Sequence, residues 1–170
     1  MRRAAEWVVF LVLAPGMALG VGPWAVLDRG WGGRVDPGGW RVFGWPVLAA
    51  GVGLMLWCWW DFATRGRGTP APFAPTHHLV VSGPYQLVRN PMYVAGVTFL
   101  IGLATVTGAP ALLGYAVAFW ILCATFVRWY EEPTLARMFG AEYARYRARV
   151  PAWVPGLRTR TVTSTPGEDA

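Results

Sequence analysis

The hydrophobic residues of this chain gather in long runs instead of alternating with polar residues. Four runs that are almost free of charge recur along the 170 residues, at about 7–27, 42–60, 92–107 and 111–129. Uncharged runs of about 18 residues or more are typical of transmembrane helices. The pattern therefore predicts an all-α integral membrane bundle of about four transmembrane helices. The short turn 108–110 would join the last two as a tight hairpin.

A helical period of a different kind follows the fourth run. Apolar or aromatic side chains recur at positions i, i+4, i+8 and i+11, at Leu135, Phe139, Tyr143 and Tyr146. Arginines occupy the other side of the segment, so we expect an amphipathic helix at 133–149. The end of the chain, 158–170, is rich in Thr, Ser, Gly and acidic residues, which predicts disorder. Residues 1–157 are then one predicted membrane domain.

The composition supports a membrane protein. Hydrophobic residues make up 55% of the chain and charged residues only 14%, whereas about a quarter of the residues in a soluble domain are charged. The net charge is +6, and all 15 basic residues are arginine. In a soluble protein this charge would favour nucleic acid as the partner. Here the arginines flank the apolar runs, which favours a membrane surface and no nucleic acid.

The arginines also predict an orientation in the membrane. Most of them lie at the N-terminus, in the loop 61–91 or after the last run, and four spans place these three regions on one side. Positively charged loops are typical of the cytoplasmic side, so we expect both termini to be cytoplasmic. A signal peptide is the alternative for the basic start and the run at 7–27, but that run is long for one.

Several polar residues in the central loop are candidates for a binding site. His77 and His78 are the two histidines of the chain, and with no cluster of other metal ligands near them they are pocket-lining donors or acceptors at most. Arg89 and Tyr93 flank a proline that starts the third run. A helix N-terminus there could bind a carboxylate or a phosphate. The alternative is a snorkelling arginine and an interfacial tyrosine.

A pair of carboxylates, Glu131 and Glu132, follows the fourth run. Two adjacent carboxylates at a membrane edge are costly unless they are solvated or partnered, so they are either a hydrated pair at a helix N-terminus or ligands of a cationic group. Arg128 lies one helical turn before Glu132 and could pair with it or bind an anionic substrate. Glycine-rich nucleotide loops after a strand, and a serine nucleophile on an elbow motif, are absent from the sequence.

The order of these motifs resembles a known enzyme family. The sequence HHLVVSGPYQLVRNPMYVAG, from His77 to Gly96, is followed after a hydrophobic hairpin by EEPTLARMFGAEYARYRARVPAWVP. Together they resemble the isoprenylcysteine carboxyl methyltransferase family and its bacterial membrane relatives, which are distantly similar to phospholipid N-methyltransferases. The resemblance covers about 66–155. Asn90 stands where many members have histidine, so no imidazole is available at that position.

The resemblance implies a methyltransferase that uses S-adenosylmethionine and methylates a hydrophobic or lipid-like acceptor at its carboxylate, amine or thiol. The cofactor loop would be 66–92, and the implied cofactor-binding residues are His77, His78, Leu79, Val80, Tyr85, Asn90, Pro91, Met92 and Tyr93. Glu131 or Glu132 would also contact the cofactor. Arg128 and Glu132 are the catalytic candidates, with Arg128 facing the acceptor. The bacterial relatives and the all-arginine composition favour a bacterial inner membrane.

Two other functions are compatible with the sequence. One is a membrane reductase with a nicotinamide cofactor, in which Arg65 and Arg67 could hold the extra phosphate. The glutamate pair argues against such a polyanion. The other is a non-catalytic membrane protein of the same fold, which predicts that glutamate-to-glutamine substitutions leave the phenotype intact.

Overall fold

The arrangement of these segments is seen in a computed structural model, which describes residues 16–66 and 79–156. All regular secondary structure in those two ranges is helical, so the predicted all-α class is confirmed. The beginning of the first apolar run, both histidines and the predicted disordered tail 158–170 lie outside the described residues.

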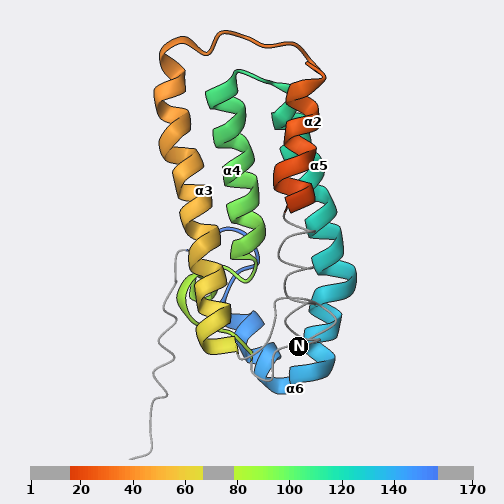
Figure 1. Ribbon diagram of the computed structural model, residues 1–170. Coiled ribbons are helices and arrows are strands. Elements are labelled where there is room, and N and C mark those ends of the chain that lie inside the picture. Colours follow the sequence, from red (N-terminus) through yellow and green to blue (C-terminus); the bar gives the residue numbers. More distant parts are fainter. Residues whose placement is uncertain (1–15, 67–78, 157–170) are drawn as a thin grey trace, which may run out of the picture.

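The long helices lie side by side along one bundle. Figure 1 shows α4 between α3 and α5, with α2 beside α5. The connection from α2 to α3 and the turn from α4 to α5 lie at one end of the bundle, and the segment 79–90 and α6 lie at the other. The elements in chain order are η1 (Gly16–Val21), α2 (Gly22–Asp28), η2 (Gly38–Trp40), α3 (Arg41–Asp61), η3 (Phe62–Gly66), η4 (Gly83–Gln86), α4 (Pro91–Thr107), α5 (Ala111–Phe126), η5 (Val127–Glu131) and α6 (Glu132–Arg149).

Glycines allow α3 and α4 to pack closely. A Cβ atom on Gly51 would meet the backbone of Phe99, and one on Gly102 would meet the backbone of Leu48. Small residues at helix crossings let two backbones approach, which is how helices commonly associate where no water is available to drive burial. Gly53 faces open space instead, so of the Gly51-x-Gly53 pair only the first residue serves this contact.

Two of the helices are long and apolar enough to cross a membrane. They are Gly38–Thr64 and the continuous helix Ala111–Arg149, whose most apolar 18-residue stretches have mean hydropathies of 1.6 and 1.8. α4 is also apolar but has only 17 residues. Large apolar side chains on the outside of the bundle remain exposed, including Leu56 at 55% and Leu122 at 69%.

The junction between α5 and α6 lies at the polar end of the bundle. α5 continues through one π-helical turn, Val127–Glu131, directly into α6. Pro133 lies in the first turn of α6 and has no backbone N–H to donate to the preceding turn of this continuous helix. Gly140 then adopts φ 48° and ψ −120°, so α6 is kinked there. Tyr143 and Tyr146, after the kink, are buried.

Candidate functional site

A cavity of about 380 Å³ lies between η1, the end of α3, α4 and the α5–η5 helix. Most of its wall is apolar, and a few polar groups gather at the end near segment 79–90. Such a combination is typical of small-molecule sites. The polar end is lined by Tyr85, Arg89, Asn90, Tyr93 and Glu131. The rest is lined by Ala18, Leu19, Met55, Phe62, Pro91, Met92, Phe119, Leu122, Cys123 and Phe126.

Glu131 and Tyr93 form a pair on the wall of this cavity. The Tyr93 hydroxyl, on the first turn of α4, donates a hydrogen bond to Oε2 of Glu131 over 3.0 Å. Glu131 is the last residue of the π-helical turn. Such turns insert an extra residue into the helical repeat and often occur at functional sites. The pair presents a carboxylate with one neutral hydrogen-bond donor to a mainly apolar space.

Glu132 has a different environment from its neighbour. Its Oε1 accepts a hydrogen bond from Nη2 of Arg89 over 2.6 Å, and its Oε2 lies 3.8 Å from Nη2 of Arg147. Nη1 of Arg89 also donates to the carbonyl oxygens of Val150, at 2.8 Å, and Arg147, at 3.2 Å. One guanidinium therefore joins the beginning and the end of α6. The kink at Gly140 lets the two ends of this helix meet.

The segment after α6 attaches to the start of α4. The backbone N–H groups of Arg89 and Asn90 donate to the carbonyl oxygens of Pro151, at 2.9 Å, and Ala152, at 3.2 Å. The side-chain amide of Asn90 donates to the same Ala152 oxygen over 3.1 Å. Asn90 is buried, and its side-chain amide is held by the Ala152 carbonyl oxygen.

These backbone bonds position Trp153 beside the cavity wall. Its ring centroid lies 6.3 Å from that of Tyr93 on α4 and 6.2 Å from that of Trp120 on α5. Aromatic rings at this separation attract each other by about 1 kcal/mol beyond the area they bury. Trp153 thus supports the ring whose hydroxyl reaches Glu131.

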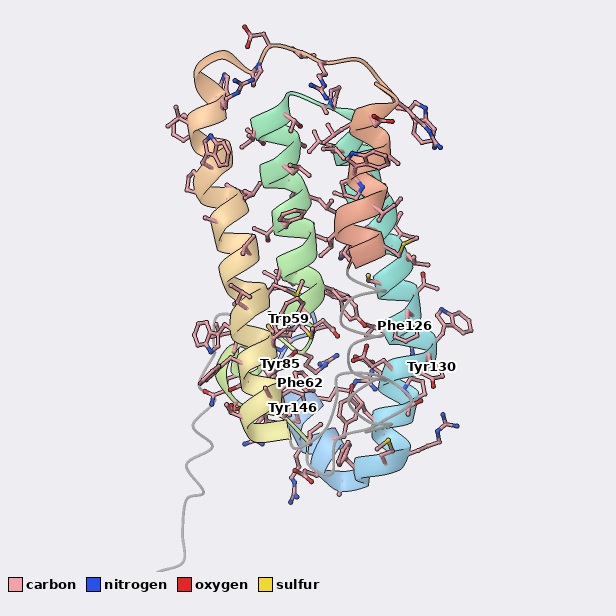
Figure 2. All side chains as sticks on the ribbon, viewed as in Figure 1. Trp59, Phe62, Tyr85, Phe126, Tyr130 and Tyr146 are labelled. Carbon is pink, nitrogen blue, oxygen red and sulfur yellow. The ribbon has the colours of Figure 1, made fainter. Side chains whose placement is uncertain are left out.

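An aromatic cluster holds the 79–90 segment against α3, and Figure 2 shows Phe62, Tyr85 and Tyr146 close together at that end of the bundle. Phe62 and Tyr85 pack edge to face with centroids 5.3 Å apart. The Tyr146 hydroxyl donates to the Tyr85 carbonyl oxygen over 2.7 Å. Burial raises the pKa of the Tyr85 phenol well above its ordinary value, so this hydroxyl stays protonated.

A buried acid at the end of α3 fixes the same segment. Asp61 is only 2% exposed, and the Ser82 hydroxyl donates to its Oδ2 over 2.6 Å. Gly83 follows with φ 54°, and a Cβ atom there would crowd the Asp61 carboxyl group and the Trp57 indole. The turn into η4 therefore needs glycine at this position.

The structure brings together seven residues that the sequence singled out. They all line the cavity: Tyr85, Arg89, Asn90, Pro91, Met92, Tyr93 and Glu131. Val80 instead packs with Cys58 and Tyr85 in a core cluster, and Leu79 is half-buried outside the lining. Arg128 is exposed on η5. Glu132 is turned to Arg89, and His77 and His78 lie outside the described residues.

Sequence reasoning missed the apolar part of the site. Phe119, Leu122, Cys123 and Phe126 are spaced i, i+3, i+4 and i+7 along α5 and share one face. That spacing is visible in the sequence, but a run that is apolar on every side does not show which face encloses a cavity. Ala18 and Leu19 of η1 were missed for the same reason.

The fold and this cavity define a helical protein of the membrane type with a polar site at one end of its bundle. Comparison with known families makes the assignment more specific, because residues 40–142, more than half of the chain, match the phospholipid methyltransferase family. The chain belongs to that family. The resemblance found in the sequence is thereby confirmed.

Similar proteins include both lipid and isoprenylcysteine methyltransferases. The chain is 35% identical over 80 residues to protein-S-isoprenylcysteine O-methyltransferase B of Arabidopsis thaliana, covering 46% of this chain and 40% of that protein. It is 28% identical over 95 residues to phosphatidylethanolamine N-methyltransferase of Schizosaccharomyces japonicus, covering 56% of this chain and 10% of that protein.

A third relative is named for metal resistance and not for methyl transfer. The cobalt-zinc-cadmium resistance protein CzcN of Cupriavidus metallidurans is 36% identical over 112 residues, covering 65% of this chain and 46% of that protein. The matched part of the chain thus spans less than half the length of each of these three relatives. Among the residues that the structure describes, His, Cys, Asp and Glu form no group of three that could hold a metal ion.

Proposed function

We propose that this protein transfers a methyl group from S-adenosylmethionine to a hydrophobic or lipid-like acceptor. The observation that carries the proposal is the cavity, which combines the Glu131–Tyr93 pair at one end with an apolar wall over the rest. Relatives in the same family are named as phosphatidylethanolamine and isoprenylcysteine methyltransferases. Their substrates combine a small polar headgroup or carboxylate with a long apolar chain.

The residues at the polar end fit the chemical groups of S-adenosylmethionine. Its sulfonium and ammonium groups are cationic, and Glu131 offers a carboxylate on the cavity wall. Its carboxylate is compatible with the N-terminus of α4, where the helix dipole favours an anion. The faces of Tyr85 and Tyr93 suit a cation or an adenine ring. When bound, S-adenosylmethionine supplies the electrophilic methyl group.

The apolar wall fits the other reactant. Leu122 and Phe126 line the cavity and remain 69% and 38% exposed. An acceptor with an acyl or prenyl chain could therefore enter sideways from the bilayer. Methyl transfer needs in-line approach and exclusion of water more than it needs an acid or a base. A carboxylate or thiolate acceptor requires no base, and with an amine acceptor Glu131 is placed to take the proton.

We also propose that four segments span the membrane, with the site at the cytoplasmic face of a bacterial inner membrane. The 21 residues of α3 extend about 30 Å, which matches the hydrocarbon thickness of a bilayer. Trp40 and Trp60, near its two ends, are 73% and 70% exposed, as expected of rings at two membrane interfaces. α4, at about 25 Å, would cross with local thinning or a partly immersed end.

Binding of S-adenosylmethionine to the purified protein tests this function. We expect calorimetry in detergent to show micromolar binding that weakens at least ten-fold in Glu131→Gln, because the variant loses a charged contact. Glu142→Gln, an exposed glutamate of α6 away from the cavity, is the matched control and should bind normally. A nicotinamide cofactor is measured alongside. Binding of that cofactor instead would favour a reductase, and binding of neither would favour a non-catalytic protein.

A further inference from the structure

α6 carries an excess of exposed positive charge. Arg137, Arg145 and Arg149 are all exposed, as is Arg147, which lies 3.8 Å from Glu132, and the acidic residue exposed on the same helix is Glu142. Glu142 lies with Arg145 and Arg149 around a shallow groove, so it offsets one of the three charges. We call Arg137, Arg145 and Arg149 the α6 arginine surface.

The contacts of these arginines do not neutralise them. Nε of Arg149 donates to the carbonyl oxygen of Arg145 over 3.3 Å, and Nη2 of Arg137 donates to the hydroxyl of Thr134 over 3.2 Å. Both acceptors are uncharged. These short-range bonds orient the side chains along the helix while their positive charge stays available to an anion in solution or at a membrane.

Exposed aromatic residues mark the depth of this surface. Trp129 and Tyr130, directly before α6, are 80% and 45% exposed, and Trp57 and Trp60 near the end of α3 are 54% and 70% exposed. The end of α3 and the η5 turn both lie at the end of the bundle where α6 lies (Figure 1). Such rings favour the headgroup region of a bilayer. α6 therefore begins where the apolar outer surface ends, which is the depth of the lipid phosphates.

The kink at Gly140 keeps the second half of α6 at the same depth. The Arg89 guanidinium joins Glu132 at the start of the helix to the carbonyl oxygens of Arg147 and Val150 at its end. The helix therefore does not extend straight away from the bundle, and its second half stays at the end of the bundle where α3 ends (Figure 1).

We propose that the α6 arginine surface binds the anionic headgroups of phospholipids in the membrane that holds the bundle. Guanidinium groups match phosphate oxygens in charge and in geometry. Each arginine near an anionic membrane surface contributes about 1 kcal/mol of attraction. This lipid contact is separate from the cavity and does not depend on methyl transfer.

The test measures the lipids that contact the protein in reconstituted vesicles. Spin-labelled phosphatidylglycerol or spin-labelled phosphatidylcholine is added as a probe to phosphatidylcholine vesicles, and electron paramagnetic resonance gives the motionally restricted fraction of each. We expect the wild-type protein to prefer phosphatidylglycerol by about five-fold at low salt. The preference should vanish in a variant with Arg137→Gln, Arg145→Gln and Arg149→Gln.

The opposite end of the bundle offers a matched control. Arg29, Arg34 and Arg41 are likewise exposed, but Asp28 and Asp36 lie among them, so their change to glutamine should leave the preference intact. Equal association of both lipids with the wild-type protein would overturn the proposal, as would an equal loss in the control variant. If the α6 variant does not fold, the salt dependence of the lipid preference is measured on the wild-type protein alone. A preference that survives 1 M salt, where screening acts within about 3 Å, would overturn it, and its loss would support it.

Discussion

The hydroxyl of Tyr93 donates a hydrogen bond to Glu131 over 3.0 Å, while the next residue, Glu132, accepts one from Arg89 over 2.6 Å. Two adjacent carboxylates thus have separate surroundings. One lies on the wall of the cavity with a neutral partner, and the other is buried in an ion pair that closes α6. The same chemical change should therefore affect ligand binding at one position and folding stability at the other.

Glu132→Gln is expected to destabilise the protein. The substitution leaves the Arg89 guanidinium, which is only 12% exposed at its side chain, without its carboxylate partner. Loss of one partner of a buried ion pair costs about 3 kcal/mol. Denaturant unfolding in detergent measures this change, with Glu131→Gln as the comparison that should unfold like the wild type. Unchanged stability together with lost S-adenosylmethionine binding would instead show that Glu132 is a cofactor ligand.

Tyr93→Phe is expected to weaken S-adenosylmethionine binding by about five-fold, which corresponds to one lost hydrogen bond. The variant keeps the ring but removes the hydroxyl that orients Glu131. Tyr115→Phe is the control, because Tyr115 also donates one hydrogen bond, to the Ala18 carbonyl oxygen at 2.8 Å, and does not line the cavity. Equal affinities of the two variants would contradict the proposed role of Tyr93.

Gly140→Ala is expected to destabilise the protein by about 2 kcal/mol, because φ 48° with ψ −120° is a backbone conformation that residues with a Cβ rarely adopt. The change should also loosen the Arg89 contacts that depend on the kink. Gly114→Ala, in an exposed part of α5 with open space around it, is the control and should be neutral or slightly stabilising. Thermal unfolding compares the two variants. Equal midpoints would show that the backbone conformation at position 140 does not require glycine.

Trp153→Ala should reduce the affinity for S-adenosylmethionine by about five-fold, because Tyr93 loses the ring that packs against it. Trp153→Phe keeps an aromatic ring there and should restore most of the affinity. Calorimetry on both variants, with circular dichroism to check the fold, makes the comparison. An equally low affinity in Trp153→Phe would mean that the indole acts in some way other than ring packing.

Much of the fold follows from local patterns in the sequence. Uncharged runs predict the helices, and Pro91 and Gly108 lie where α4 begins and ends. The positions of the arginines placed the central loop and the glutamate pair on the same side, and the structure shows them in contact through Arg89 and Glu132. The order of the motifs was also sufficient to identify the family, because the order and spacing of motifs are properties of the sequence alone.

Only the tertiary structure decided which of the two glutamates lines the cavity and which one forms the ion pair. In the sequence Glu131 and Glu132 are equivalent neighbours, and Arg128 is as good a partner for Glu132 as any other arginine. Which carboxylate faces the cavity is decided by the π-helical turn that ends at Glu131 and by the distant Arg89, which the kink at Gly140 lets reach both ends of α6. Likewise, a helix that is apolar on all sides shows its cavity face only once its neighbours are placed. Hydrophobic patterning determines which segments leave water, whereas side-chain direction and long-range partners determine what they enclose.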